Sequence, residues 1–293
     1  MRKVGIIPNF KKDKDMKLTK EIIGYIEENG GQVLLNEIEA NKVNRKDLAY
    51  KSYKMYKESD FIIVLGGDGT LLSVARRVGW YETPILGINL GRLGFLTEVE
   101  LNDLYCALEK IFSGNYNIEK RMMLEAAIVS NNVQVDTFYA LNDVVITKGA
   151  FARIVRLKAY VDDNYLDTYP ADGLIIASPT GSTAYSLSAG GPIVNPQNSL
   201  LVITPISPHT LHARSIIVSE NEKIRVEMDG NYNEIVLTVD GQQGYKLKEG
   251  DTVIISKADF HAHFLKVNDR TFYDVLRMKL SERRSERNGI NSE

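Results

Sequence analysis

A glycine-rich loop directly after a short apolar run constrains this chain more than any other feature. Residues 61–65 are apolar and end abruptly at Gly66-Gly67-Asp68-Gly69-Thr70, after which residues 71–75 resume apolar side chains at helical spacing. This order predicts a buried strand, a tight turn and the start of a helix. Glycines let the backbone approach a ligand closely. The amides at the start of the helix favour a bound anion.

Asp68 is the unusual residue of this loop. Its carboxylate would repel a phosphate group unless a metal ion or a hydroxyl group lies between them. A carboxylate in this position is therefore best explained as a base or as a metal anchor. The structural alternative is an ordinary strand–helix turn in which Asp68 caps the helix. The loop alone does not separate these two interpretations.

Length and composition narrow the class of protein. A chain of 293 residues predicts about two domains, and its hydrophobic fraction of 44% is ordinary for a globular protein. The net charge of −2 gives no electrostatic basis for a nucleic-acid or membrane partner. A single cysteine excludes an internal disulfide, and the N-terminus runs into a predicted strand without a signal-peptide cleavage pattern. These features favour a cytoplasmic protein.

The first third of the chain alternates predicted strands with predicted helices. The strands are expected at residues 4–7, 33–35, 61–65 and 84–89, and the helices at residues 18–26 and 48–56. This alternation predicts a Rossmann-like α/β domain with a parallel sheet over residues 1–101. Ligands of such sheets bind beyond the carboxyl ends of the strands. Gly91 and Gly94 follow the fourth strand, so a second glycine turn is expected beside the first.

The pattern changes after a helix predicted at residues 103–112. Short β-rich segments separated by turn residues continue to about residue 255, which predicts an all-β layered or sandwich domain over residues 102–265. Residues 272–280 are expected to form a helix that returns to the first domain. Residues 281–293 are charged and polar, so a frayed tail is expected.

Residues 172–192 form the second informative stretch. A predicted strand delivers a loop rich in Ser, Thr and Gly, from Ser178 to Thr183, and a further run of small residues continues to Pro192. Small hydroxyl side chains offer hydrogen bonds without filling space, which suits a planar base or a sugar. The alternative is a turn-rich segment with a structural role only.

Two shorter motifs lie at predicted strand ends. Asn142-Asp143 offers an amide beside a carboxylate, which suits vicinal ribose hydroxyls or an adenine edge; the alternative is a β-turn. Asp240-Gly241 is typical of a hairpin turn. The four histidines do not have the spacing of a metal site. The chain also lacks the P-loop, the G-x-G-x-x-G fingerprint and the protein-kinase signatures.

With the Gly66–Thr70 loop, Asn142-Asp143 and the stretch from Asp172 to Pro192 in this order, the chain resembles the bacterial NAD kinases over nearly its whole length. The glycine–aspartate loop alone is shared with diacylglycerol kinases, sphingosine kinases and, in variant form, phosphofructokinases. The long Ser/Thr/Gly stretch is far more specific to NAD kinases. The resemblance implies transfer of the γ-phosphoryl group of ATP to the 2′-hydroxyl of the adenosine ribose of NAD, which gives NADP.

The resemblance also implies roles for individual residues. Asp68 matches the family's catalytic base, and Gly66, Gly67, Gly69 and Thr70 match the loop that holds phosphates together with Mg²⁺. The implied NAD-binding positions are Asn142, Asp143, Arg153, Asp172, Thr183, Ala184, Tyr185, Ser186, Leu187, Ser188 and Gln242. Relatives form homotetramers or homodimers in which a neighbouring subunit completes part of the pocket.

The chain departs from the family pattern at two positions. The family pair is often Asn-Glu, so Asp143 is one methylene shorter, and Pro170 stands where relatives often carry a basic side chain.

Two other functions use the same motifs. A lipid kinase with this loop would need an apolar groove for acyl chains, and a non-catalytic sensor would bind NAD or NADP without producing NADP from NAD and ATP.

Overall fold

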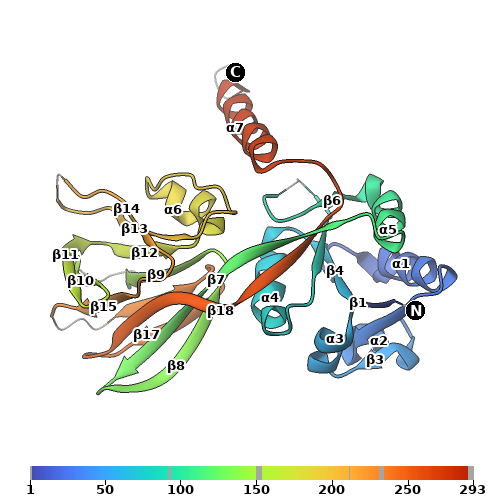
Figure 1. The fold of residues 1–293 in the computed structure, drawn as a ribbon, viewed down its shortest axis with the longest axis horizontal. Helices are drawn as coiled ribbons and strands as arrows, with labels where there is room; N and C mark the ends of the chain where they lie inside the picture. Colours follow the sequence, from blue (N-terminus) through green and yellow to red (C-terminus); the bar gives the residue numbers. More distant parts are fainter. Residues whose placement is uncertain (1, 92–93, 150–153, 211, 231–233, 290–293) are drawn as a thin grey trace. The chain divides into compact units, whose positions relative to one another are not determined.

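The computed structural model describes residues 2–91, 94–149, 154–210, 212–230 and 234–289, with the backbone alone described for residues 282–289. The chain forms two compact units (Figure 1). One contains the described residues up to Glu119 and from His263 onward, and the other contains Lys120–Ala262. The first is α/β with a parallel sheet and the second is antiparallel β, which confirms the predicted fold class.

A parallel sheet forms the centre of the first unit. Its strands are β1 (Lys3–Ile7), β2 (Gln32–Asn36), β3 (Ala49–Tyr50), β4 (Phe61–Gly66) and β5 (Ile85–Asn89), with β6 (Val99–Glu100) and the end of β18 (Thr252–Lys266) paired to β5. The order is β5-β4-β1-β2-β3. The chain first moves from β1 toward β3 and then returns to the other side of β1 as β4. Such a reversal of direction creates a ligand crevice at the carboxyl ends of the strands.

Helices pack on this sheet and connect its strands. They are α1 (Lys17–Glu28), α2 (Glu37–Lys42), α3 (Ser52–Glu58), α4 (Asp68–Val78) and α5 (Leu104–Phe112), and a further helix, α7 (Phe272–Gly289), follows the last strand of the chain. The helix predicted at residues 48–56 begins only at Ser52, because Ala49 and Tyr50 pair with the end of β2. The helix predicted at residues 272–280 continues to Gly289, and its first ring, Phe272, contacts Phe95 at 6.3 Å between centroids.

Two antiparallel sheets form the second unit. One has the order β14-β13-β12-β9-β16-β17, and the other contains β11-β10-β15-β18, with β7 paired to β18 and β8 paired to β7. These strands are β7 (Asn117–Ser130), β8 (Val133–Ala140), β9 (Asp143–Lys148), β10 (Val155–Val161), β11 (Asn164–Ala171), β12 (Gly173–Ala177), β13 (Leu200–Ile206), β14 (Ile216–Ser219), β15 (Ile224–Met228), β16 (Ile235–Val239) and β17 (Gln243–Leu247). Both sheets contribute to one apolar core, in which Ile146 and Leu174 of the first join Leu157 and Val226 of the second.

The outer face of the six-stranded sheet carries the Ser/Thr/Gly stretch. This stretch forms a 3₁₀ helix, Thr180–Thr183, and a single helical turn, α6 (Tyr185–Ser188). Val194 packs on this face against residues that include Val145 and Ile175, so the segment is anchored over β12 and β13. Among the described residues, no helix has the length and apolar character needed to cross a membrane.

Candidate active site

The Gly66–Thr70 loop connects β4 to α4 at the carboxyl edge of the parallel sheet. All six residues of β4 are buried, and α4 begins at Asp68 with Gly67 as its N-cap. A Cβ on Gly66 would lie 2.5 Å from Thr70 Oγ1, so the loop closes only with glycine at this position. The predicted order of strand, turn and helix is confirmed.

The carboxylate of Asp68 does not cap its own helix. It accepts the backbone N–H of Phe95 at 2.8 Å and that of Leu96 at 3.1 Å, which lie 27 and 28 residues further along the chain. The N-cap interpretation is therefore wrong, because the helix end has no side-chain cap. A carboxylate held by two amides still has lone pairs for another donor. Asp68 thus joins two turns and keeps the capacity to accept a hydroxyl proton.

The second glycine turn lies beside the first, as predicted. A Cβ on Gly94 would lie 1.9 Å from Asp68 Oδ1, so the backbone of Gly94 packs directly on the carboxylate. The N–H of Gly94 donates to Thr97 Oγ1 at 2.8 Å, which holds this turn independently of Asp68. Arg92 and Leu93 of the same turn lie outside the described residues.

The loop after β1 also contacts the Gly66–Thr70 loop. Asn9 Nδ2 donates to Thr70 Oγ1 at 3.4 Å, while Asn9 Oδ1 accepts the N–H groups of Lys11 and Lys12. A Cβ on Gly91 would lie 3.3 Å from Lys12 Nζ. The loops that follow β1, β4 and β5 are therefore linked at one edge of the sheet.

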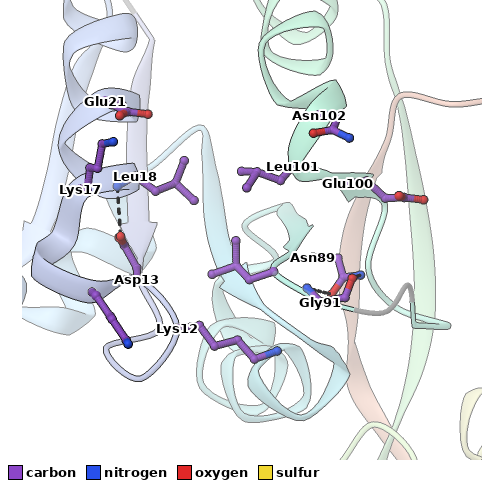
Figure 2. A pocket seen from close by; sticks show the side chains of 12 residues that line it. Lys12, Asp13, Lys17, Leu18, Glu21, Asn89, Gly91, Glu100, Leu101 and Asn102 are labelled. Atoms are coloured by element: carbon purple, nitrogen blue, oxygen red, sulfur yellow. Dashed lines mark hydrogen bonds between the residues drawn. The ribbon is translucent and has the colours of Figure 1, made fainter.

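A cavity of about 630 Å³ opens between the start of α1 and the segment that follows β5 (Figure 2). Lys12, Lys14 and Lys17 line it together with the carboxylates of Glu21 and Glu100. Asp13 accepts the N–H groups of Leu18 and Thr19, both at 3.0 Å, so two amides at the start of α1 already have a partner. An anion bound in this cavity would therefore be held by the lysine side chains rather than by these two amides.

A second cavity, of about 390 Å³, lies in the β unit. Of the predicted site residues, Asn142, Asp143, Ala184 and Tyr185 line it. The rest of the cavity wall is formed by Val145, Thr147, Thr238, Asp240 and Gly241. Asp143, Val145 and Thr147 alternate along β9, so one face of this strand forms the floor of the cavity. The Asn142-Asp143 motif and the Ala184-Tyr185 segment are thus brought together, although they lie 42 residues apart in the sequence.

The hydroxyl groups of the Ser/Thr/Gly stretch mostly serve the fold of the loop itself. Ser178, Ser182 and Ser186 are fully buried. Ser182 Oγ donates to backbone carbonyl oxygens, including that of Pro179, and Ser186 Oγ lies 3.0 Å from Thr204 Oγ1. The sequence predicts that this density of small hydroxyl residues forms a ligand surface. The hydrogen bonds within the loop are a second, structural cause of the same composition. Thr183, Leu187 and Ser188 do not line the cavity.

Three further predicted residues lie elsewhere in the chain. Asp172, between β11 and β12, forms an ion pair with Lys148 Nζ at 2.9 Å. Lys148 therefore gives Asp172 a cationic neighbour although Pro170 occupies the position that is often basic in relatives. Gln242 is exposed in the turn between β16 and β17, and its N–H donates to Val239 O. Arg153 lies outside the described residues.

Asp143 has an environment that alters its ionisation. Its side chain is buried, and this burial raises the pKa of Asp143 to about 7, with a further contribution from the negative charge of Asp240; an N–H bond from Tyr185 acts in the opposite direction. Between pH 4 and pH 7 the folded protein should therefore hold a proton at Asp143 that the unfolded chain has lost. Folding stability should fall as the pH rises through this range.

We expect the Asp143→Asn variant to show a smaller loss of stability between pH 5 and pH 8 than the wild type. Asparagine does not titrate, and one pKa unit corresponds to about 1.4 kcal/mol, so the difference should be of the order of a few kcal/mol at most. Urea unfolding at both pH values measures it. The same pH effect in both proteins would show that Asp143 ionises normally.

Within the described residues, no group of three or more His, Cys, Asp and Glu side chains gathers in a way that could hold a metal ion. Mg²⁺ commonly needs only one or two protein carboxylates beside substrate phosphates.

Comparisons with known proteins assign the family. The model of the ATP-NAD kinase N-terminal domain matches residues 4–116, and that of the ATP-NAD kinase C-terminal domain matches residues 141–267. The NAD kinase of Caldanaerobacter subterraneus subsp. tengcongensis is 53% identical over 283 residues, which cover 97% of this chain and all of the relative. The NAD kinase of Natranaerobius thermophilus is 45% identical over 281 residues, which cover 96% of this chain and 98% of the relative.

Two solved structures share the fold. The yeast NADH kinase complexed with NADH gives a TM-score of 0.85 at 26% identity and covers 94% of this chain and 86% of the other. An NAD kinase from Archaeoglobus fulgidus in complex with ATP gives a TM-score of 0.74 at 26% identity and covers 94% of this chain and 97% of the other. On both domain matches and on identity over almost the full length, the chain belongs to the ATP-NAD kinase family.

Proposed function

We infer that this chain transfers the γ-phosphoryl group of ATP to the 2′-hydroxyl of the adenosine ribose of NAD, which gives NADP. The observation that carries this conclusion is the match to NAD kinases over 97% of the chain. Two sites support it: one carries a carboxylate in a glycine loop, and the other an amide–carboxylate pair in a cavity. A lipid kinase is not favoured, because the relatives that match nearly the whole chain are NAD kinases.

Asp68 is the proposed catalytic base. Its carboxylate accepts the hydrogen bond of the 2′-hydroxyl and takes the proton as the oxygen attacks the γ-phosphorus of ATP; the bond from this phosphorus to the leaving ADP oxygen breaks. The amides of Phe95 and Leu96 orient the carboxylate and leave lone pairs for the hydroxyl. Positioning and electrostatic stabilisation supply most of the acceleration in reactions of this type.

The proposed donor site is the edge that carries the Gly66–Thr70 loop. In this proposal the backbone of the Gly66–Thr70 loop holds the phosphates of ATP at the start of α4, and Lys12 adds a cation from the neighbouring loop. Mg²⁺ bound to these phosphates would neutralise charge on the transferred phosphoryl group. The residues proposed to bind NAD are Asn142, Asp143, Thr183, Ala184, Tyr185, Ser186, Leu187, Ser188, Asp172, Arg153 and Gln242.

A cytoplasmic homo-oligomer, either a tetramer or a dimer, is proposed as the working form. The single cysteine of the chain is compatible with a reducing compartment. Asp172 is partly exposed at 38% of its side chain, so it is available to a ligand bound by a neighbouring subunit. Size-exclusion chromatography with light scattering measures the number of subunits.

The purified chain should produce NADP from NAD, ATP and Mg²⁺. An NADP-specific dehydrogenase coupled to the reaction reports the product, and parallel reactions with NADH or polyphosphate define the acceptor and the donor. Binding of NAD without any NADP would indicate a nucleotide sensor instead. Phosphorylation of diacylglycerol without NADP formation would indicate a lipid kinase.

We expect Asp172→Ala to raise the KM for NAD by about threefold to tenfold, because a hydrogen bond to a charged group contributes about 1.5 kcal/mol and this carboxylate is partly screened by solvent. The kcat should change little. Asp229→Ala is the matched control, since Asp229 is also an exposed carboxylate in an ion pair, with Arg156 and Lys158. An equal KM in wild type and Asp172→Ala would remove Asp172 from the NAD site.

A further inference from the structure

Asp240 holds the backbone of the Asn142-Asp143 motif from one side. Its carboxylate accepts the N–H groups of Leu141 at 3.1 Å, Asn142 at 2.8 Å and Asp143 at 3.2 Å, although it lies 97 to 99 residues further along the chain. Its own N–H donates to Asp143 O at 2.9 Å. These three backbone partners are donors, so an acceptor-only carboxylate suits this position. Its side chain is buried, with 8% exposed.

Ser178 holds the same backbone from the other side. Its N–H donates to Asn142 O at 2.8 Å, and its Oγ donates to Leu141 O at 2.5 Å. Gly181 packs on this segment so closely that a Cβ would lie 2.0 Å from Asn142 O. The N–H groups of residues 141–143 therefore bind the Asp240 carboxylate, whereas the carbonyl groups of Leu141 and Asn142 bind Ser178. This double clamp sets the direction in which the side chains of Asn142 and Asp143 point.

The two clamps differ in charge. Asp240 brings a negative charge against the buried carboxyl of Asp143, whereas Ser178 is neutral. From α6, the backbone N–H of Tyr185 faces Asp143. Among the described residues of this unit, the buried cation is Arg121 of β7, which donates to Thr180 Oγ1 in the loop that carries Ser178. Asp143 and Asp240 also line the same cavity, so a ligand there meets both.

We propose that Asp240 is a positioning residue that fixes the Asn142-Asp143 backbone and disfavours ionisation of the Asp143 carboxyl, so that the protonated form of Asp143 donates a hydrogen bond to bound NAD. This rests on the proposed function, because it takes NAD as the ligand of this cavity. A neutral carboxyl both donates and accepts, whereas an ionised one only accepts. A raised pKa at Asp143 agrees with the proposal, since burial next to a like charge disfavours ionisation.

The affinity for NAD as a function of pH tests this proposal. Isothermal titration calorimetry from pH 5.5 to pH 8.5 should show wild-type affinity falling above about pH 7, toward tenfold for each pH unit once Asp143 must be protonated to bind. Asp240→Asn removes the like charge, so the midpoint of this fall should move to lower pH. Ser178→Ala loosens the clamp without changing the charge; it should weaken binding at every pH and leave the midpoint in place.

Asp143→Asn keeps the test decisive if Asp240→Asn does not fold. The amide donates a hydrogen bond but does not titrate, so this variant should bind NAD with an affinity that is constant over the same pH range. Wild-type affinity that does not depend on pH, an unmoved midpoint in Asp240→Asn, or a large loss of NAD binding in Asp143→Asn at low pH would each overturn the proposal. Absence of NAD binding by the wild type at every pH would instead overturn the proposed function, and this inference with it.

Discussion

Asp68→Asn should lower the kcat for NADP formation by about 10²-fold or more, because it removes the group that takes the proton from the 2′-hydroxyl. The KM for NAD should change little, since Asp68 is not among the residues that line the cavity proposed for NAD. Steady-state kinetics with the coupled assay measure both quantities. Near-wild-type turnover would reject the role of Asp68 as the base.

A loss of activity in Asp68→Asn has a second physical cause that must be separated. The carboxylate accepts the N–H groups of Phe95 and Leu96, and an amide replaces one of these acceptors with a donor. Thr97→Val is the matched control, because it removes the bond from Gly94 N–H to Thr97 Oγ1 and loosens the same turn without touching Asp68. A much smaller loss of kcat in Thr97→Val would assign the effect to the base. Equal losses in the two variants would assign it to the turn.

Gly94→Ala should have the second largest effect. The new Cβ would lie 1.9 Å from Asp68 Oδ1 and 2.3 Å from Asp68 Cγ, so either the carboxylate or the turn has to move. Overpacking of this kind commonly costs about 1–3 kcal/mol. We expect a kcat loss of about 10²-fold, similar to that of Asp68→Asn, because the base is displaced.

Thermal unfolding and kcat should be measured together for Gly94→Ala. Gly24→Ala in α1 is the control, since a Cβ at Gly24 meets no atom within 4 Å. This control should keep wild-type activity and gain a little stability, because Ala is a better helix former than Gly. A Gly94→Ala variant with wild-type kcat would show that the contact between Gly94 and Asp68 has no role in catalysis.

Local sequence patterns predicted the parts of the site that depend on neighbours in the chain. Residues 61–75 form a strand, a turn and a helix because the apolar pattern and the glycines specify these elements directly. The second glycine turn was predicted beside the first because the carboxyl ends of adjacent parallel strands share one edge, and the pairing of β4 with β5 brings them together.

The partners of the key carboxylates were not predictable in the same way. Asp68 binds amides 27 and 28 residues away, and Asp240 binds amides almost 100 residues away. Such bonds depend on where strands end and how they pair, which local propensity does not specify. The Asp240-Gly241 dipeptide does form the predicted turn between β16 and β17, but the pattern gave no sign that its carboxylate also clamps Asn142.

The Ser/Thr/Gly stretch shows what composition alone leaves open. Small hydroxyl residues suit both a ligand surface and a tightly folded loop, and their sequence does not indicate which way each side chain points. Ser186 is fully buried against Thr204, whereas its neighbour Tyr185 lines the cavity. The short helical turn of α6 separates them, because adjacent residues of a helix point in different directions.

The distance between the Asp68 carboxylate and the ribose 2′-oxygen tests the account most directly. It should be measured in a crystal structure of the chain with NAD and a non-hydrolysable ATP analogue bound with Mg²⁺. The account predicts a carboxylate oxygen within about 3.2 Å of the 2′-oxygen, on the side away from the γ-phosphorus. A 2′-oxygen held by other groups, with both oxygens of Asp68 still occupied only by the amides of Phe95 and Leu96, would contradict it.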